Sequence, residues 1–464
     1  MQTRTEQDSM GKLNVPIDAL YQAQTQRAVQ NFRISGQTLP VDFIQALLQI
    51  KKAAAETNLQ LGLVDADIST AICQAADQQL SELAKPQPSL RHYPIDVFQT
   101  GSGTSTNMNV NEVLATLASK ALGKNISPND HVNLGQSSND TIPSAIHISA
   151  ALAVQQQLLP SLQQLQQQLV EKAQQIGHLV KTGRTHLMDA MPVNFSQILG
   201  GWQAQLHQAE QQLKQQLSFL QALAQGGTAV GTGINADPAF AATFCKQLSH
   251  NTGLAFSPAA NFFAAIGSQD TAVSVSGALK TLAVCLMKMS NDLRWMNSGP
   301  LAGLGEISLP ALQPGSSIMP GKVNPVIPEA VAMVCAQVIG NDCCITVAGQ
   351  SGNFELNVML PLIAQNLLHS IRLLANGCTA LSEQAIKDFT VQEDNISKPL
   401  ALNPILVTAL NPLIGYAKAA EIAKQAYQQQ RPVLDVALEH TSYSRKELMS
   451  LLDPAKLCQG GNSA

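Results

Sequence analysis

Residues 313–329 combine side chains that can bind and react with an anionic substrate. The segment reads QPGSSIMPGKVNPVIPE. Proline fixes φ and glycine permits positive φ, so this composition predicts a loop of defined shape rather than a plain helix or strand. Ser316 and Ser317 place two hydroxyls at its tip, and Lys322 and Asn324 add a cation and an amide. Such a set suits a substrate whose negative charge grows during reaction.

One plainer interpretation of this segment stays open, and another fails. A loop rich in glycine and proline is often only a connector between helices. A phosphate-binding loop requires the pattern G-x-x-x-x-G-K-[ST]. Here five residues separate Gly315 from Gly321, and Val323 stands where a hydroxyl is needed. The pattern therefore argues against a nucleotide-binding enzyme.

Three further polar segments could contribute to the same site, namely residues 100–107, 136–141 and 183–187. In a helical bundle, loops far apart in sequence can meet at one end. Helix N-termini also favour anions through free N–H groups and the macrodipole. With residues 315–324, these segments predict a pocket for small carboxylates. The alternative for the first two is simple helix capping, since Ser, Thr, Asn and Asp are preferred at that position.

His186 and Glu329 each have two interpretations. A lone histidine is usually structural or merely exposed, but Arg184 and Thr185 place His186 in a polar segment rather than on a core face. Glu329 can be a first-turn helix acid that favours the dipole, or it can pair with His186 and set its tautomer. The histidines and cysteines lack metal-binding spacing, so no metal is expected.

Composition indicates a large helical protein with few charges. The 464 residues are 45% apolar, 4% aromatic and only 13% charged, with a net charge of −4. So low a charged fraction suggests that helix surface is hidden against other subunits. No block of Lys or Arg is present, which argues against nucleic acid or an anionic membrane as the main partner.

The cysteines and the N-terminal residues predict a cytoplasmic location. The eight cysteines resemble buried thiols of a reducing compartment, and a bridge between the neighbours Cys343 and Cys344 would be strained. The first residues, MQTRTEQDSMGKLNV, lack the apolar region of a signal peptide. No run of 18 uninterrupted apolar residues predicts a membrane span.

Hydrophobic periodicity predicts helices throughout and little β structure. Residues 1–40 are expected to form an irregular arm with one short helix. The expected helices span residues 19–32, 41–61, 67–85, 110–122, 144–176, 196–223, 270–296, 327–347 and 355–381. The predicted domains are a mostly helical N-terminal domain (1–139), a central long-helix bundle (140–390) and a small C-terminal helical domain (391–464).

The polar segments resemble those of the fumarase/aspartase superfamily. Its signature, G-S-S-x-M-P-x-K-x-N-P, is matched in full by GSSIMPGKVNP. The segments GSGTSTNMNVNEV, HVNLGQSSNDT, TGRTHLMDAMP and GGTAVGTG look like class II fumarate hydratase, and the likeness extends over nearly the whole chain. The resemblance implies a mainly α, three-domain fold whose central long-helix bundle assembles into a tetrameric multi-helix core.

Within the superfamily, two positions favour fumarase and one segment favours aspartase. Aspartases carry Gln where this chain has His186, and Ser-Thr-Asn-Asp where it reads Ser137-Ser138-Asn139-Asp140. The VIPE segment after Pro325 resembles the aspartase form instead. The resemblance therefore implies reversible hydration of fumarate to L-malate, a step of the tricarboxylic acid cycle. The alternatives are an ammonia-lyase acting on L-aspartate and a non-catalytic helical structural protein.

The family implies a catalytic role for several matched residues. Ser316 would be the general base that removes the C3 proton of malate. Lys322 and Asn324 would hold the charge of the resulting aci-carboxylate. His186, paired with Glu329, would act through a water near the leaving hydroxyl.

The family also implies how substrate and subunits are held. The substrate carboxylates would be bound by side chains from several segments, namely Ser102, Thr104, Ser137, Ser138, Asn139, Thr185, Lys322 and Asn324. A second dicarboxylate site would involve Ser127, Asn129 and Asp130, weakened because Ser127 stands where the family has histidine. Four chains would form a tetramer, and each active site would be built by three of its subunits. No cofactor is needed.

Overall fold

The computed structural model describes residues 2–460 and consists mainly of helices. In that part of the chain, strands are confined to two-stranded sheets, of which only the β5–β6 pair is parallel. The prediction of a mainly α protein with minor β structure is confirmed.

The helices are α1 (Ala23–Asn31), α2 (Val41–Gln60), α3 (Ala66–Leu83), α4 (Thr104–Leu122), α5 (Ser138–Ala153), α6 (Leu159–Ile176), α7 (Phe195–Leu220), α8 (Phe240–Thr252), α9 (Phe262–Gly267), α10 (Asp270–Met296), α11 (Val326–Gly349), α12 (Leu360–Leu381), α13 (Glu393–Leu402), α14 (Asn411–Ile414), α15 (Tyr416–Gln429), α16 (Val433–His440), α17 (Arg445–Leu451) and α18 (Pro454–Leu457). The π-helical segments are η1 (Pro128–Val132), η2 (Val154–Leu158) and η3 (Ser382–Ile386), and η4 (Pro404–Leu410) is a 3₁₀ helix. The strands are β1 (Thr3–Asp8), β2 (Gly11–Pro16), β3 (Val180–Thr185), β4 (Met188–Asn194), β5 (Ala222–Leu223), β6 (Ser257–Pro258), β7 (Ile307–Ser308), β8 (Gly352–Asn353), β9 (Leu356–Asn357) and β10 (Thr390–Val391).

The chain divides into two compact units. Unit 1 comprises Met1–Pro160, Ala209–Ala283 and Ala336–Ala375, and unit 2 comprises Ser161–Gln208, Val284–Cys335 and Asn376–Ala464. The boundaries expected after residues 139 and 390 stay a prediction. Residues 1 and 461–464 of the predicted terminal domains lie outside the described residues.

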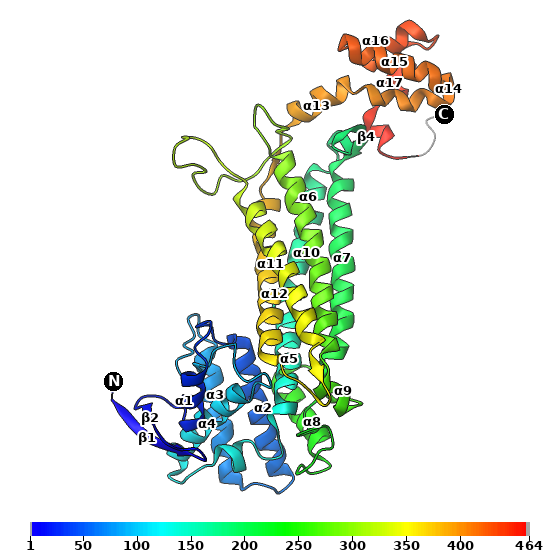
Figure 1. Cartoon of the computed structure of the whole chain (residues 1–464). Coiled ribbons are helices and arrows are strands. Elements are labelled where there is room, and N and C mark those ends of the chain that lie inside the picture. Colours follow the sequence, from blue (N-terminus) through cyan, green and yellow to red (C-terminus); the bar gives the residue numbers. More distant parts are fainter. Residues whose placement is uncertain (1, 461–464) are drawn as a thin grey trace. The chain divides into compact units, whose positions relative to one another are not determined.

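Unit 1 is built around α2. This helix packs against α3, α5 and α8, and α3 packs against α4 (Figure 1). Phe43, Leu47 and Ile50 follow helical spacing and are fully buried. On α8, the rings of Phe240 and Phe244 stack with their centroids 6.0 Å apart. This core supports the N-terminal ends of α4 and α5, which carry several of the predicted substrate-binding residues.

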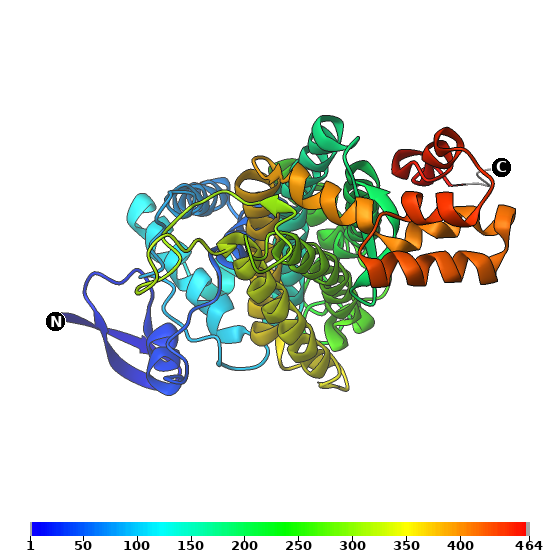
Figure 2. The same cartoon turned by 90° about the horizontal axis from the view of Figure 1, so that it is seen from above.

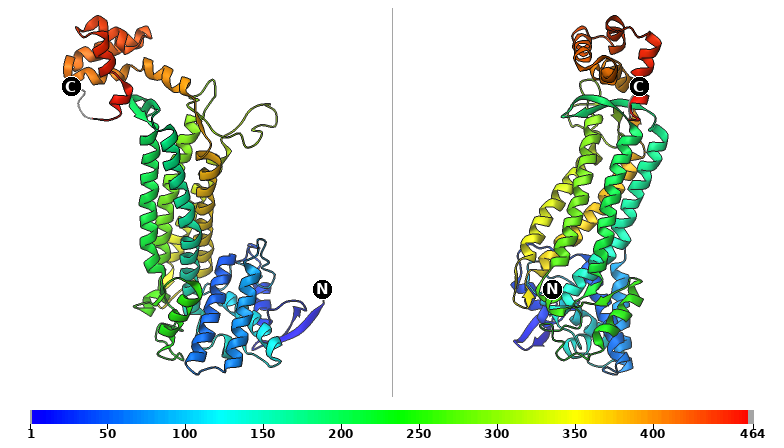
Figure 3. Two further views of the ribbon diagram at one scale, coloured as in Figure 1. Left: turned by 180° about the vertical axis from the view of Figure 1, so that it is seen from behind. Right: turned by 90° about the vertical axis from the view of Figure 1, so that its right-hand side faces the viewer.

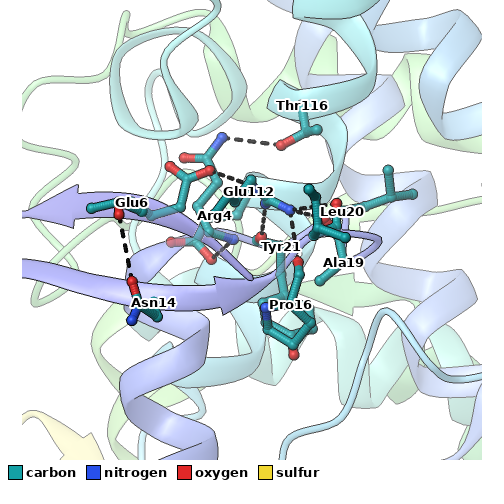
Figure 4. Close-up of polar contacts among 12 residues, drawn as sticks. Arg4, Glu6, Asn14, Pro16, Ala19, Leu20, Tyr21, Glu112 and Thr116 are labelled. Atoms are coloured by element: carbon teal, nitrogen blue, oxygen red, sulfur yellow. Dashed lines mark hydrogen bonds and ion pairs between the residues drawn. The ribbon is translucent and has the colours of Figure 1, made fainter. Parts of the chain in front are cut away.

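The expectation of an irregular N-terminal arm was wrong for residues 3–16, which form the β1–β2 hairpin (Figure 2). Its residues alternate between half-buried and exposed, but the sequence shows little matching alternation of apolar and polar residues. Long-range bonds hold it instead: the Arg4 guanidinium donates to four carbonyl oxygens and pairs with Glu6 at 2.7 Å (Figure 4). Buried Glu112 of α4 accepts the N–H groups of Gln22, Gln24 and Thr25 at the start of α1.

Most expected helices are present, but several begin elsewhere. The helices expected at 41–61, 67–85, 196–223 and 270–296 match α2, α3, α7 and α10 within a few residues. In contrast, α4 and α5 begin six residues before the expected starts at 110 and 144, whereas α12 begins five residues after 355. The polar residues that were predicted to form loops are instead the first helical turns of α4 and α5. No helix was expected where α8 lies.

The long helices lie side by side within each unit, as expected for a bundle. In unit 1, Asp342 of α11 accepts hydrogen bonds from Ser276 and Lys280 of α10, and Asn341 of α11 donates to Ser370 of α12. In unit 2, a cavity lies between α6 and α7, lined by residues such as Val170 and Gln203. The cysteines Cys285 of α10, Cys335 of α11 and Cys378 of α12 are buried. The prediction of a long-helix bundle is confirmed.

The last helices of unit 2 form a small core of their own. Leu410, Ile422, Val436 and Leu448 are fully buried within it. These helices contact the β3–β4 hairpin through α18 and η4 (Figure 3). Asn403 fixes this contact, because its side-chain amide donates to the carbonyl oxygen of Ala190 at 2.8 Å.

Two helices, α10 and α11, are long and apolar enough to cross a membrane by length and composition alone. Core helices of proteins that do not enter membranes pass the same test. In α11 only 33% of the apolar window is buried within the chain, and Met333 is 69% exposed.

The cysteines of the described residues are free, but the expectation that they are all buried was wrong for exposed Cys343 and half-buried Cys73 and Cys344.

Candidate functional site

His186 lies at the tip of a tight hairpin rather than in a loop. Strands β3 and β4 pair through Thr185 and Met188, so that His186 and Leu187 form the two-residue turn. Their φ angles are 56° and 60°, in the left-handed region that hairpin turns of this length require. Neither residue is glycine, and such strain in an exposed turn is a common mark of a functional site. Both His186 and Thr185 are exposed.

A bulge at Gly183 re-aims the end of β3 toward this turn. The register shifts between Thr182 and Arg184. A Cβ at Gly183 would approach the carbonyl oxygen of Met191 to 2.5 Å, so a side chain cannot be accommodated without moving the partner strand. The hairpin and its bulge therefore fix where Thr185 and His186 are presented.

The segment 315–324 closes on itself through its own polar groups. The N–H of Gly315 donates to the carbonyl oxygen of Lys322 at 2.7 Å, and the Asn324 amide donates to the carbonyl oxygen of Gly315 at 2.7 Å. The Lys322 ammonium donates to Oδ1 of Asn324 at 2.6 Å. A Cβ at Gly315 would lie 2.6 Å from the Lys322 carbonyl oxygen, so only glycine permits this closure.

Ser316 stands within this closed segment with its hydroxyl oxygen already bonded. Oγ accepts the backbone N–H of Ile318 at 3.2 Å and that of Met319 at 3.0 Å. Because the oxygen is an acceptor in both bonds, its own proton remains available for transfer. Two N–H donors aimed at one hydroxyl oxygen also favour its ionised form. The arrangement is suited to a serine that acts as a base.

A cavity of 920 Å³ in unit 2 brings three of the predicted residues together. Lys322, Asn324 and Glu329 line it, and so does Arg294 from the last turn of α10. Arg294 was missed by the sequence analysis, because nothing in a helical pattern marks one exposed arginine as facing a distant loop. Its guanidinium adds a second cation to the cavity that contains Lys322.

Unit 1 holds five of the predicted substrate-binding residues at two helix N-termini. Ser102 and Thr104 join through their hydroxyls at 2.8 Å where α4 begins. Between them, Gly103 has φ 72°, and a Cβ there would approach Ile142 to 2.9 Å. Backbone N–H groups of the first turn of α4 add to the hydroxyls as donors for an anion, except that of Thr106, which donates to Gln99 at 3.1 Å.

The second N-terminus belongs to α5 and carries Ser137, Ser138 and Asn139. Ser137 forms a capping box with Asp140, accepting the N–H of Asn139 at 3.2 Å. Asn139 also donates to the carbonyl oxygen of Ala229 at 2.8 Å. The expected capping role is therefore present, and it leaves the Ser137 proton available to a ligand.

Asp140 anchors this turn from inside the core. Its carboxylate is fully buried and accepts the N–H groups of Ser137, Gly226 and Thr228. Burial raises the pKa of Asp140 to about 6, although these hydrogen bonds oppose the shift. The glycine-rich segment 226–233 thus has a structural task, which is to cover the buried carboxylate.

A buried network that the sequence analysis missed supports Ser138. Lys51 of α2 donates to Oδ1 of Asn133 at 3.1 Å and to Oε1 of Gln136 at 2.9 Å. Asn107 of α4 donates to the same Asn133 oxygen and to Oγ of Ser138 at 3.0 Å. Burial lowers the pKa of Lys51 to about 7. The spacing of asparagines on α4 was the available signal, because Asn107 and Asn111 share one helix face.

Two further groups of predicted residues differ in whether the structure brings their members together. Ser127, Asn129 and Asp130 lie together at the π-helical segment η1, where the Ser127 hydroxyl donates to Asp130 at 2.8 Å. These three provide no cation, and their role in a second dicarboxylate site stays a prediction. Among residues 2–460, no hydrogen bond or ion pair links His186 to Glu329, whose proposed pairing likewise stays a prediction.

The comparisons with known proteins cover nearly the whole chain. A family model described as lyase matches residues 11–340, and one described as the fumarase C C-terminus matches residues 406–459. The chain belongs to the class II fumarase family.

Among its curated relatives is a class II fumarate hydratase of Pseudomonas aeruginosa, which is 64% identical over 99% of both chains. A class II fumarate hydratase of Xylella fastidiosa is 58% identical over 99% of this chain and 96% of its own length. The crystal structure of class II fumarase from Schistosoma mansoni superposes with a TM-score of 0.94 at 38% identity, covering 98% of this chain and 99% of the other. The long-helix fold of this fumarase-family chain is thus shared over nearly all of its length.

The buried Asp140 gives a test of how the α5 terminus is held. Its folded pKa of about 6 exceeds the ordinary value of 3.8, so the folded state retains a proton that the unfolded state has lost between these values. Stability from this group is full below about pH 4 and is lost as pH rises through 6. Relative to Asp140→Asn, the unfolding free energy of the unmodified protein should fall by about 2–3 kcal/mol from pH 4 to 6.5. Chemical denaturation at several pH values measures it, and parallel curves for the two proteins would contradict it.

Proposed function

We propose that the protein is a fumarate hydratase that interconverts fumarate and L-malate. The observation that carries this proposal is the bonding of Ser316, whose Oγ accepts two backbone N–H groups inside the loop that defines the family. Full-length relatives at 58–64% identity are curated as class II fumarate hydratases.

In the proposed elimination, the Ser316 alkoxide takes the C3 proton of malate. The electron pair left on carbon spreads into the adjacent carboxylate, which becomes a doubly charged aci-carboxylate. Lys322 and Asn324 stabilise this charge, and their mutual bond at 2.6 Å keeps both near the loop. The C2 hydroxyl then leaves as water after receiving a proton from the His186 side, and fumarate is released.

Besides Lys322 and Asn324, the groups that hold the substrate carboxylates in this proposal are neutral donors. Ser102 and Thr104 lie at the N-terminus of α4, and Ser137, Ser138 and Asn139 at that of α5. Thr185 lies beside His186 on the hairpin. Because Asn107 donates to Ser138, the Ser138 proton points to another acceptor, as binding of a carboxylate requires.

We also propose that four chains assemble and share each active site among three subunits. Apolar side chains exposed on α11, such as Met333, Ile339 and Val347, support this proposal because they gain burial only from another chain. The free cysteines support a reducing, cytoplasmic location for an enzyme of the tricarboxylic acid cycle.

The direct test is ultraviolet absorbance of fumarate formed from L-malate, with L-aspartate in a parallel run. A chelator is present and no cofactor is added. Absorbance should rise with malate and stay flat with aspartate. A rise with aspartate alone would establish an ammonia-lyase and contradict the hydratase.

The proposed base is tested by Ser316→Ala, which removes the reacting hydroxyl. Turnover should fall by at least about 1000-fold, because proton abstraction then has no base. The melting temperature should change little, since the loop hydroxyl supports no core. Ser397→Ala, which removes the hydroxyl of an exposed serine of α13, is the matched control and should retain turnover. Near-normal turnover in Ser316→Ala would contradict the assignment of Ser316 as the base.

For His186→Asn we expect a large loss of turnover.

The proposed assembly is tested by light scattering after size exclusion. The mass should equal four chains of 49.3 kDa. A substitution of Met333 by Glu places a charge on the exposed apolar face of α11 and should shift the mass toward smaller species. A fully active species with the mass of one chain would contradict the sharing of sites among subunits.

A further inference from the structure

The hairpin that carries Thr185 and His186 needs support from outside itself. His186 and Leu187 both adopt left-handed backbone conformations, and Leu187 is 66% exposed. Non-glycine residues keep such a conformation only where the surrounding structure determines it. The turn itself is exposed, so any support must act on the strands beneath it.

Glu306 provides a buried anchor for β3. It is 3% exposed, and its Oε1 lies 2.8 Å from Nη2 of Arg184. Its Oε2 lies 3.1 Å from Nζ of Lys181. Both cations belong to β3, on either side of the bulge at Gly183. Arg184 directly precedes Thr185. The Glu306 carboxylate therefore holds the strand one residue before the predicted site residues Thr185 and His186.

The main chain of Glu306 is itself fixed from two sides. Its N–H donates to the carbonyl oxygen of Met296 at the end of α10, at 2.8 Å. Its carbonyl oxygen accepts the N–H of Gln392 at 2.8 Å, beside the pairing of Ile307 with Val391. The anchor therefore cannot follow the hairpin if the hairpin moves.

The neighbours of Glu306 also border the cavity that contains Lys322 and Asn324. Gly305 and Ile307 both line it. One short segment thus forms part of the wall of that cavity and, through one side chain, holds the strand leading to His186. A shift of Glu306 would disturb the placement of the hairpin with respect to this wall.

We propose that Glu306 is a positioning residue for the reaction. Its carboxylate holds Lys181 and Arg184 so that the strained turn presents Thr185 and His186 in one orientation. The inference rests on the proposed roles of these two residues. The competing explanation is that Glu306 stabilises the fold alone, since loss of one partner from any buried ion pair leaves uncompensated charge.

The principal test is Glu306→Gln, assayed with malate and fumarate in the full-length protein. We expect kcat/KM to fall by at least about tenfold, because small displacements of reacting groups have large kinetic effects. The matched control is Asp342→Asn, another buried carboxylate that accepts from a lysine and a hydroxyl but contacts none of the predicted site residues. It should lower the melting temperature while keeping kcat/KM within about twofold.

A milder variant covers the case in which Glu306→Gln fails to fold. Arg184→Met breaks only the contact next to Thr185 and leaves Glu306 paired with Lys181. It should also lower kcat/KM by at least about fivefold. If Glu306 acts through the hairpin, adding Glu306→Gln to His186→Asn should cause a smaller further loss than Glu306→Gln causes alone, because only the effect through Thr185 remains.

Three outcomes would overturn the inference. Glu306→Gln and Arg184→Met could both retain kcat/KM within twofold while His186→Asn is inactive, which would leave Glu306 a purely structural residue. The losses could multiply in the double variant, which would place Glu306 in a separate role. Full activity of His186→Asn would refute the role of His186 and this inference with it, without affecting the assignment of Ser316.

Discussion

Two backbone N–H groups directed at one serine oxygen are the interaction on which the proposed chemistry depends. A serine hydroxyl is a weak acid, so its ionised form must be stabilised before it can remove a proton from carbon. A hydrogen bond to a charged group contributes about 1.5–3 kcal/mol, so the two bonds to Ser316 supply roughly 3–6 kcal/mol. That amount is substantial but does not complete the task. Charge on Lys322 and exclusion of water on substrate binding must supply the rest.

The same requirement explains why the loop around Ser316 is closed on itself. N–H groups stabilise an alkoxide only if they are already directed at it when the proton moves. The bonds from Gly315 to Lys322 and from Asn324 to Gly315 fix the loop before substrate arrives. An exposed loop without these bonds would lose the alignment to thermal motion. The shape set by glycine and proline is therefore a catalytic requirement as much as a turn requirement.

Much of the fold follows from local sequence, whereas its long-range polar contacts do not. The apolar spacing of α2 or α10 predicts each helix almost to its ends, because burial of one face decides the structure. The starts of α4 and α5 were placed too late because Thr104 and Ser138 belong to polar runs that read as loop. The β1–β2 hairpin was missed because Arg4 bonds four carbonyl oxygens that no local pattern reveals.

The residues of the candidate site also differ in how far the sequence alone reveals them. Ser316, Lys322 and His186 lie in segments whose unusual composition attracts attention in the sequence. Lys51 and Glu306 lie in ordinary-looking stretches, and their partners are more than 80 residues away along the chain. Their importance comes from burial, which makes each charge depend on a few specific partners. Residues of this kind become visible only when the tertiary structure places those partners.

Electrostatics also connects the low charge of the chain to how it would hold a dianion. The net charge of −4 offers no general attraction for fumarate or malate. In unit 1 the predicted binding groups are hydroxyls, amides and the N-termini of α4 and α5, with Asp140 buried beneath the second of these. Each helix terminus carries roughly half a positive charge, which is oriented and costs no desolvated cation. Two cations, Lys322 and Arg294, line one cavity beside the segment in which new negative charge appears. Binding by dipoles in one place and stabilisation by cations in another would favour the charged intermediate over the ground state, and this difference is what accelerates a reaction.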